Sequence, residues 1–502
     1  MATISTETNG KNQPVVQMSR LRGITPFIIK RTAAIFVLGV LFSICMESFA
    51  QSGERVYQTY CGGCHGTDLD GTAAGSSLLE PTLKHGHDRN SILHNIRNGI
   101  LGTTMVSWES ALTEADIEAV TDYILNARKA PDEVKPVEKA LTFNTQDYKL
   151  KIEKVVTEGL EAPWGIEFVD ADRALVTGNK GEVYWVINGK AGPEKITGLP
   201  QVYAYDMYGG MMDLALGPDY SKNGWVYFAF SHTPTGTSDK NAPGMTNVVR
   251  GKIKDNQWVK QETLFEAPDS ILVEGGMRWG SRLLFDKEGY LYFSIGDMQQ
   301  AIQSGNNPQL PHRAEGKIFR IHPDGSIPKD NPHFGKDGTL QGIYAWGTRN
   351  VQGIAQHPVT GEIYFTDHGP KGGDEVNRLK KGGNYGWPVI TYGVNYDGST
   401  ITHLTHEEGM EQPLTYWDPS IAVCAAQFVT GNKYPKWQNN LLVTALKDEE
   451  IRRLVVDGDQ ILSQEVILKG HGRVRDVKIG PDGYLYVLTN SPDALLRITP
   501  MD

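Results

Sequence analysis

The sequence has few cysteines, no cluster of basic residues and no long apolar run. Its 502 residues include four cysteines, at positions 45, 61, 64 and 424, which is too few for the disulfide framework of a small secreted domain. The formal net charge is −10, without any block of lysine and arginine, so nucleic-acid binding is not expected. An apolar run from Ala33 to Ile44 is too short for an ordinary membrane span. What is abundant is glycine, with 55 residues, and this favours many tight turns.

The first fifty residues have the pattern of an export signal. Residues 1–31 are largely polar and basic, the apolar run follows, and Ser48-Phe49-Ala50 offers a small-residue cleavage site. This order predicts a signal peptide over residues 1–50, cleaved near Ala50, and a periplasmic or otherwise exported protein. Two alternatives remain open: an uncleaved anchor, or a lipid attached to Cys45. Membrane contact is expected only in those two cases.

The stretch Cys61-Gly62-Gly63-Cys64-His65 has the C-x-x-C-H spacing of a covalently attached haem. The thiols of Cys61 and Cys64 can each add to a haem vinyl group, which holds His65 beside the iron as an axial ligand. A zinc knuckle would need two further ligands, and the sequence has no second cysteine pair. A thioredoxin-like redox pair would lie in a βαβ unit, which is not evident here. The motif therefore predicts haem c and one-electron transfer.

Residues 51–128 are expected to form a small all-α domain around this motif. Thr113 with Asp116 predicts the start of the last helix, as a variant capping box. Met105 lies 40 residues after His65, in a loop before that helix, which is where the sixth iron ligand is expected, although a lone methionine is more often a core residue. Two apolar stripes with helical spacing are Ile92, Ile96, Ile100 and Ile117, Val120, Ile124. The domain resembles class I cytochromes c, which implies His65–Met105 ligation and a relatively high reduction potential.

The rest of the chain consists of a linker and a repeat. Residues 129–147 carry Pro131 and Pro136 among charged residues with no periodic pattern, which predicts a linker. From residue 148 onward an apolar run, a turn and an alternating aromatic run recur. The copies begin at Gly165, Leu214, Leu283, Ile354, Phe428 and Val477. Each copy is interpreted as a hairpin that cannot bury its apolar face alone. Six copies predict an all-β six-bladed propeller over 148–502; a sandwich of repeated hairpins is the alternative.

Several motifs of this repeat region are shared with one family. They are Gly347-Thr-Arg349-Asn350-Val-Gln-Gly353, His368-Gly369-Pro370 with Asp374-Glu375, Gly383-Asn384-Tyr385-Gly386-Trp387-Pro388, Gly472-Arg473-Val-Arg475-Asp476, and Lys317 to Pro332. In this order they resemble the PQQ-dependent soluble glucose/aldose sugar dehydrogenases, also called the glucose/sorbosone dehydrogenase family. The resemblance covers residues from about 150 to 502 and implies a propeller that binds PQQ, calcium and a sugar.

PQQ is a flat quinone with three carboxylates, which need fixed cations if they are to be buried. Arginine suits this role because its fork pairs with both oxygens of a carboxylate. Arg473 and Arg475 alternate along the chain, so on a strand they can face the same side. The resemblance implies PQQ contacts at Arg349, Asn350, Lys447, Arg473, Arg475 and Thr489. For any one of these arginines the alternative is a solvated surface charge.

The resemblance also implies two calcium sites. The backbone carbonyls of Gly369 and Pro370 are implied to hold the calcium that polarises the quinone, since calcium prefers oxygen ligands. Asp374, Glu375 and Tyr385 match positions of a second, structural calcium. A solvent-facing acidic turn is the alternative for Asp374 and Glu375.

Two positions depart from the family pattern on the substrate side. In Arg278-Trp279-Gly280-Ser281-Arg282 the motif is intact, except that Arg278 holds the place of the catalytic histidine, and arginine cannot accept a proton. Asp297, by contrast, is retained. Tyr208 stands where the family has a glutamine that contacts the substrate. The general base is therefore unknown, with Glu274, His312 and His368 as candidates.

These observations predict an exported quinohaemoprotein oxidoreductase. It would oxidise a sugar, an aldose or a related alcohol, with PQQ, and pass electrons singly through haem c to an external acceptor. The alternative is a non-catalytic propeller that binds PQQ or a glycan and uses the haem for electron relay or sensing. The expected partners are the small-molecule substrate and the electron acceptor, with no nucleic acid.

Overall fold

The computed structural model describes residues 52–72, 75–79, 83, 85–100, 103–128, 141–205, 208–298, 306–334 and 339–501. The predicted signal peptide, its cleavage point near Ala50, Cys45 and most of the predicted linker lie outside the described residues. The chain divides into two compact units, Met1–Lys135 and Pro136–Asp502, and each is considered by itself. Within the described ranges, no helix is long and apolar enough to cross a membrane.

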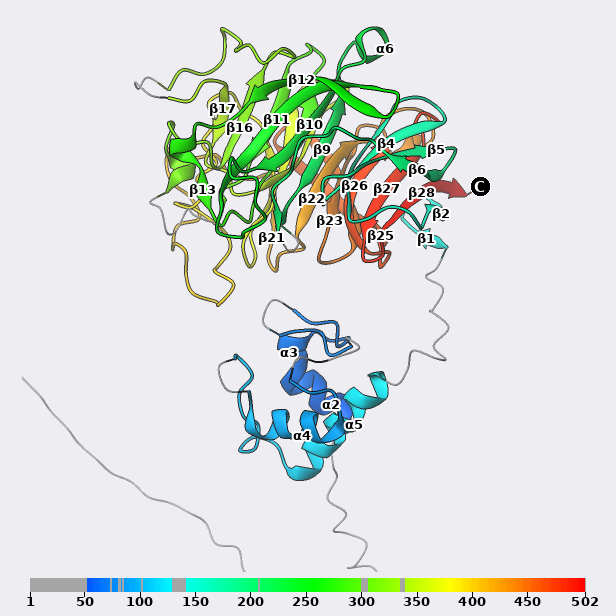
Figure 1. Ribbon diagram of the computed structural model, residues 1–502, viewed down its shortest axis with the longest axis vertical. Helices are drawn as coiled ribbons and strands as arrows, with labels where there is room; N and C mark the ends of the chain where they lie inside the picture. The colour runs from blue at the N-terminus through cyan, green and yellow to red at the C-terminus, as the bar shows by residue number, and fades with distance from the viewer. Residues whose placement is uncertain are drawn as a thin grey trace, which may run out of the picture. The chain divides into compact units, whose positions relative to one another are not determined.

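The N-terminal unit is helical (Figure 1). Its elements are α2 (Gly53–Val56), η1 (Tyr57–Cys61), α3 (Gly62–His65), α4 (Arg89–Asn98) and α5 (Glu114–Arg128). The predicted stripes form its core, in which Val56, Tyr57, Ile92, Ile96, Ile117, Val120 and Ile124 are at most 5% exposed. The predicted capping box is present, because the Asp116 amide donates to Thr113 Oγ1 and the Thr113 amide donates to Asp116 Oδ2, both at 3.2 Å. The expectation for Ile100 was wrong: α4 ends at Asn98, since Gly99 has a φ of +72°, which terminates a helix.

The second unit is a six-bladed β-propeller, as predicted (Figure 1). The first blade contains β3 (Pro163–Phe168), β4 (Arg173–Gly178), β5 (Val183–Ile187) and β6 (Lys190–Lys195). The second contains β9 (Met211–Leu216), β10 (Val226–His232), β11 (Pro243–Lys254) and β12 (Gln257–Phe265), with β13 (Val273–Glu274) beside β11. The third contains β14 (Leu283–Phe285), β15 (Leu291–Ile295), β16 (Lys317–Ile321) and β17 (Ile343–Trp346). All pairings within these blades are antiparallel.

The other three blades complete the ring. The fourth contains β18 (Val351–Gln356), β19 (Ile363–Asp367), β20 (Asp374–Arg378) and β21 (Thr415–Trp417). The fifth contains β22 (Val423–Phe428), β23 (Leu441–Ala445), β24 (Glu450–Asp457) and β25 (Gln460–Lys469). The sixth contains β26 (Arg473–Ile479), β27 (Leu485–Asn490) and β28 (Ala494–Met501), followed by β2 (Lys149–Val156) and β1 (Thr142–Asn144). Shorter elements are β7 (Ala204–Tyr205), β8 (Tyr208–Gly209), α6 (Tyr220–Asn223), η2 (Asp269–Ile271), η3 (Asn307–Gln309) and η4 (Pro435–Trp437).

The repeat seen in the sequence maps onto the blades. Each of the six copies falls in a different blade and covers residues of its first two strands; the first copy also includes β5, and the fifth begins at the last residue of β22. In the sixth blade, β28 at the C-terminus pairs with β2, with Ile152 opposite Ile498 (Figure 1). This pairing closes the ring with strands from both ends of the unit, which leaves no open edge between the first and last blades. One boundary was wrong: β1 lies inside the predicted linker 129–147, because three residues are too few to give a strand pattern.

A buried ion-pair network ties the blades together at the centre of the propeller. The Arg282 guanidinium, 3% exposed, is 3.1 Å from Asp213 Oδ1 on β9 and 3.2 Å from Asp476 Oδ1 on β26. It also donates to the Gln352 carbonyl of β18 at 2.7 Å and lies 4.5 Å above the Trp164 ring of β3. Five of the six blades therefore meet at this one side chain.

Candidate functional sites

The C-x-x-C-H motif lies on a short helical stretch of the N-terminal unit. Cys61 is buried, Cys64 is exposed and His65 is half-buried. The His65 Nδ1 atom is 2.8 Å from the carbonyl oxygen of Ser76. Because a carbonyl oxygen can only accept, Nδ1 carries the hydrogen and Nε2 is the nitrogen left to bind a metal. The histidine is thus held in the tautomer that an axial iron ligand requires, and the motif fits a haem.

Met105 is half-buried and packs against the core of the same unit, together with Trp108. Its loop is fixed on both sides: the Met105 amide donates to Thr103 Oγ1 at 3.1 Å, and its carbonyl accepts from the Ile100 amide at 2.9 Å. Ligation of iron by Met105 remains a prediction.

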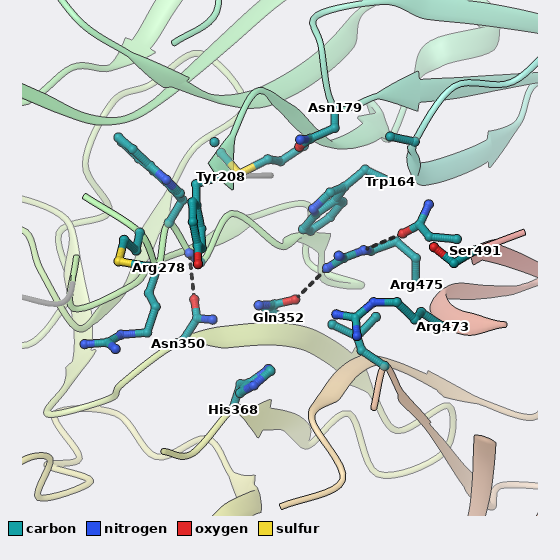
Figure 2. Close-up of a pocket in the computed structure, with 18 of the residues that line it drawn as sticks. Trp164, Asn179, Tyr208, Arg278, Asn350, Gln352, His368, Arg473, Arg475 and Ser491 are labelled. Carbon is teal, nitrogen blue, oxygen red and sulfur yellow. Dashed lines mark hydrogen bonds between the residues drawn. The ribbon is translucent and has the colours of Figure 1, made fainter. Parts of the chain in front are cut away.

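In the propeller, a cavity of about 500 Å³ is lined by residues from all six blades. Trp164, Met212, Gln352 and Arg475 come from β3, β9, β18 and β26 of the first, second, fourth and sixth blades. Arg278 precedes β14 of the third blade, and Leu446 follows β23 of the fifth. Figure 2 shows Arg473 and Arg475 on one side of this cavity, and Tyr208 and Arg278 on the other. Residues far apart in the sequence therefore form one site on the propeller axis.

Arg278 is held by a carboxylate beneath it. Its Nε and Nη2 atoms are 2.6 and 3.0 Å from the two oxygens of Asp297, whose side chain is fully buried. Trp387 Nε1 also donates to Asp297, at 2.8 Å. Asp297 thus orients Arg278 and does not itself line the cavity. At this place the structure offers a guanidinium in an ion pair, which has no site for accepting a proton.

Arg349 and Asn350 lie deep in the same cavity. Their two amides donate to Asp367 at 2.8 and 2.6 Å, and the Arg349 Nη1 atom donates to the Gly369 carbonyl at 2.6 Å. Asn350 Oδ1 accepts from the Gly280 amide at 3.0 Å. Burial, and then the positive charge of Arg278, lower the pKa of Arg349 below its usual range. Its Nε atom is buried and has no hydrogen-bond partner among the residues that the structure describes.

Arg473 and Arg475 both line the cavity from β26. Arg475 Nη1 donates to Gln352 Oε1 at 3.0 Å. Burial, followed by the charge of Arg475, lowers the pKa of Arg473. The cavity therefore concentrates positive charge in a way that an anionic ligand would relieve.

Two residues expected to contact PQQ are not among the residues that line this cavity. Lys447 is exposed, and its Nζ atom donates to the Ser420 carbonyl at 3.1 Å. Thr489 is fully buried, and its hydroxyl donates to the Pro492 carbonyl at 2.9 Å. Its neighbours Asn490 and Ser491 line the cavity instead. Successive side chains of a strand point to opposite faces, so Thr489 on β27 turns away from the cavity that Asn490 lines.

The residues expected to hold the second calcium do not fit a common site. The Asp374 carboxylate already accepts from the Gly369, Ala422 and Val423 amides and from the Ser420 hydroxyl, at 2.6 to 3.2 Å. Glu375 follows it on β20, so the two side chains point to opposite faces of the sheet. The Tyr385 hydroxyl donates to the Arg378 carbonyl and accepts from the Lys380 amide. Within the described ranges, no cluster of three His, Cys, Asp or Glu side chains could hold a metal.

The three candidates for a general base are separated by the structure. Glu274 and His312 are exposed and do not line the cavity, whereas His368 does, with its ring directed into it (Figure 2). The Nδ1 atom of His368 is buried, and no described residue hydrogen-bonds to it. Burial lowers the pKa of His368 to about 4.

Sequence reasoning missed much of the cavity lining. The missed residues include Trp164, Gln352, Tyr396, Asn490, Ser491 and Asp493. Gln352 lies in the motif Gly347 to Gly353, two residues after Asn350, so strand alternation could have indicated that its side chain faces the same side as that of Asn350. Nothing in the sequence marks Trp164 or Tyr396, which come from distant segments.

Residues 160–497 match the family model described as Glucose / Sorbosone dehydrogenase, and the chain therefore belongs to that family. Residues 48–124 match the model described as Cytochrome C oxidase, cbb3-type, subunit III, so the N-terminal unit is a cytochrome c domain. The aldose sugar dehydrogenase of Escherichia coli (strain K12) is 36% identical over 354 residues, covering 69% of this chain and 92% of that protein. Quinoprotein glucose dehydrogenase B of Acinetobacter calcoaceticus is 27% identical over 414 residues, covering 67% of this chain and 85% of that protein.

A solved structure agrees with these matches. The crystal structure of the soluble aldose sugar dehydrogenase from Escherichia coli, in the apo-form, has a TM-score of 0.63 and 33% identity. The aligned region covers 70% of this chain and 100% of the Escherichia coli chain. The protein is thus an oxidoreductase-family propeller fused to a cytochrome c domain.

Proposed function

We propose that this protein is an exported quinohaemoprotein that oxidises an aldose or related alcohol with PQQ bound in the propeller cavity. Electrons then pass one at a time to a haem c on the N-terminal domain and on to an external acceptor. The observation that carries the proposal is the cationic cavity on the propeller axis, in a chain that also contains a C-x-x-C-H motif. Two relatives, named an aldose sugar dehydrogenase and a quinoprotein glucose dehydrogenase, support it.

The cavity fits a flat, multiply charged anion. Arg473 and Arg475 can pair with carboxylates on one side, and Asn350 supplies an amide at the centre. Arg349 Nε and His368 Nδ1 are buried and have no partner within the described part of the chain, so a bound polar ligand would give each a hydrogen bond. Trp164 offers an aromatic wall whose ring is 5.7 Å from the Arg475 guanidinium. When bound, PQQ would accept the two electrons that are released when the carbon bearing a sugar hydroxyl group is oxidised.

The remaining parts of the proposal concern haem and calcium. Cys61, Cys64, His65 and Met105 would attach and ligate the haem. Calcium is proposed only at the Gly369 and Pro370 carbonyls. The Gly369 oxygen accepts from Arg349, but a carbonyl oxygen has a second lone pair for a cation.

The test is reduction of the haem by sugars in the full-length protein. Protein carrying haem is loaded with PQQ, with and without calcium, and the haem absorbance is followed after aldoses and other sugars are added. Reduction that requires PQQ supports the proposal. It should be lost in the variant that combines Arg473→Ala with Arg475→Ala, in which we expect the affinity for PQQ to fall by at least about 100-fold, at about 1.5–3 kcal/mol for each of the two charged hydrogen bonds. Equal PQQ affinity in this double variant would contradict the assignment of the cavity.

One observation favours the alternative of a non-catalytic propeller. The place of the family's base is taken by Arg278, which is ion-paired with Asp297. A positioned base contributes about 10²–10⁴-fold to rate, so its loss is not minor. Tight PQQ binding together with no haem reduction by any sugar tested would select this alternative.

A further inference from the structure

The wall of the cavity that faces Arg473 and Arg475 contains a guanidinium with an unused edge. Nε and Nη2 of Arg278 are engaged by Asp297, but Nη1 makes no hydrogen bond with any described residue. The Arg278 side chain is 16% exposed and lines the cavity. The bidentate pair fixes the plane of the guanidinium and leaves Nη1 outside the ion pair, on a side chain that lines the cavity. A second carboxylate can dock on such an edge in a defined orientation.

An aromatic surface lies beside this edge. Tyr208 is on the same side of the cavity as Arg278 (Figure 2). Its ring centroid is 5.6 Å from that of Tyr205, which in turn is 5.4 Å from that of Tyr203. These contacts support the ring of Tyr208 from behind. Aromatic rings provide apolar area for the C–H face of a sugar ring while the rim stays polar.

The lining as a whole carries an excess of positive charge, and on this wall Asp297 lies behind Arg278 as its ion-pair partner. Four guanidinium groups line the cavity, those of Arg278, Arg349, Arg473 and Arg475. Among the described lining residues the one carboxylate is Asp493, which accepts from the Ala162 amide at 2.7 Å and from Asn490 at 3.3 Å. Arg473 and Arg475 lie across the cavity from Arg278 (Figure 2). A cofactor whose carboxylates are held by that pair therefore leaves Arg278 to the substrate.

We propose that Arg278 and Tyr208 form a subsite for a sugar acid, such as a uronic acid, with the carboxylate on Arg278 and the ring against Tyr208. The inference rests on the proposed function, since it names the substrate class of the same cavity. A hydrogen bond to a charged group that replaces one to water is worth about tenfold to a hundredfold in affinity. A neutral aldose leaves the Arg278 edge without an anion, so the sugar acid binds more tightly by that factor.

The test uses the full-length protein with haem and PQQ bound. D-glucuronate and D-glucose are titrated by calorimetry, with quenching of tryptophan fluorescence as a second readout. Glucuronate should bind at least about tenfold more tightly than glucose. Arg278→Gln should remove that preference, so that glucuronate and glucose bind to the variant with affinities that agree within about twofold. Arg278→Lys, which keeps the charge but loses the fork, should retain part of the preference.

A matched control is Arg173→Gln, because Arg173 is half exposed on β4 in an ion pair with Asp170, outside this cavity. It should leave both sugar affinities unchanged. Equal affinity of the native protein for glucuronate and glucose overturns the inference. So does a loss of PQQ affinity in Arg278→Gln as large as the loss for glucuronate, since Arg278 would then hold the cofactor.

The inference and the proposed function fail in different measurements. PQQ is titrated first, by its own absorption, and absence of binding there contradicts the proposed function before any sugar is added. If PQQ binds and glucuronate is preferred, the subsite is supported, and haem reduction then decides whether the bound sugar acid is oxidised. Preference for the neutral sugar, with haem reduced by glucose, supports the proposed function and rejects the sugar acid.

Discussion

The two units of this protein build their candidate sites in opposite ways. In the cytochrome c domain, Cys61, Cys64 and His65 fall within five consecutive residues, and the Ser76 carbonyl that orients His65 is 11 residues away. In the propeller, the cavity lining extends from Ala162 to Asp493 and needs all six blades. A covalent attachment site depends on local spacing, whereas a cavity on an axis depends on the whole ring. The first kind of site can be read from a motif, and the second only from the fold.

The units also differ in how they use charge. The ion pairs of the cytochrome domain lie on its surface, as with Arg89 and Asp122, whose side chains are 43% and 54% exposed. Such pairs add about 0–1 kcal/mol to stability. The propeller instead buries Arg282 between Asp213 and Asp476. Substitution of an ion-paired residue should therefore have a small effect at an exposed pair, such as Arg89–Asp122, and a large effect at the buried pair in the centre of the propeller.

The sharpest test of this contrast removes the attachment site. Cys61→Ala combined with Cys64→Ala should abolish covalent haem, because both thioether bonds need these thiols. The pyridine haemochrome of denatured protein should disappear, while PQQ affinity stays within about twofold, the change expected where no contact with the ligand is removed. Cys424→Ala is the matched control: this cysteine is fully buried in the propeller, and its removal should leave the haem content unchanged. Loss of PQQ binding in the double variant would show that the two sites depend on each other.

The next largest effect is expected at the centre of the propeller. Arg282→Met leaves Asp213 and Asp476 buried without their shared cation, and breaking a buried pair costs about 3–5 kcal/mol. The free energy of unfolding, followed by tryptophan fluorescence in denaturant, should fall by that amount. Arg173→Met, at an exposed arginine, should change it by less than about 0.5 kcal/mol. A small effect for Arg282→Met would mean that solvent or relaxed packing replaces the network.

A third test uses pH. Lys317 is fully buried, its Nζ donates to the carbonyls of Asn307, Pro308 and Glu315 at 2.7 to 3.2 Å, and burial lowers its pKa to about 7. In the unfolded chain the pKa of lysine is about 10.4, so between these values the unfolded state binds the extra proton. The free energy of unfolding should therefore rise with pH above 7, by up to about 1.4 kcal/mol per pH unit. Lys317→Met should remove this contribution, and an unchanged slope in the variant would assign it to another group.

The smallest effect is expected in the cytochrome domain. Thr113→Ala removes the hydroxyl that accepts from the Asp116 amide at the start of α5, which should cost about 1 kcal/mol. Thr113→Ser keeps the hydroxyl and serves as the control. The midpoint of thermal unfolding, followed at the haem absorbance, should fall for Thr113→Ala but not for Thr113→Ser. The unfolding midpoint of the propeller, followed by tryptophan fluorescence, should not change in either variant. A shift in both signals would show that the units unfold together.

Sequence patterns predicted the architecture because the repeat was regular. Six copies of one hairpin indicated six blades, and Thr113 with Asp116 indicated the start of α5. Predictions for single residues were less successful where alternation or a short strand decided the outcome. The Thr489 hydroxyl donates to the Pro492 carbonyl, and the Asp374 carboxylate accepts hydrogen bonds from backbone amides. Both were named from a motif, which fixes a position on the chain but not the partners of its side chain.

The sequence by itself determined the two domains, the haem motif and the departure at position 278, because each depends on spacing or on a single side chain. Only the tertiary structure decided what Arg278 does, because Asp297 is 19 residues away and Trp387 belongs to the next blade. The same holds for the cavity, in which Tyr208 and Arg278 face Arg473 and Arg475 across the propeller axis (Figure 2). Backbone pairing places residues within a blade, but the packing of six blades in a ring sets which side chains meet at the centre.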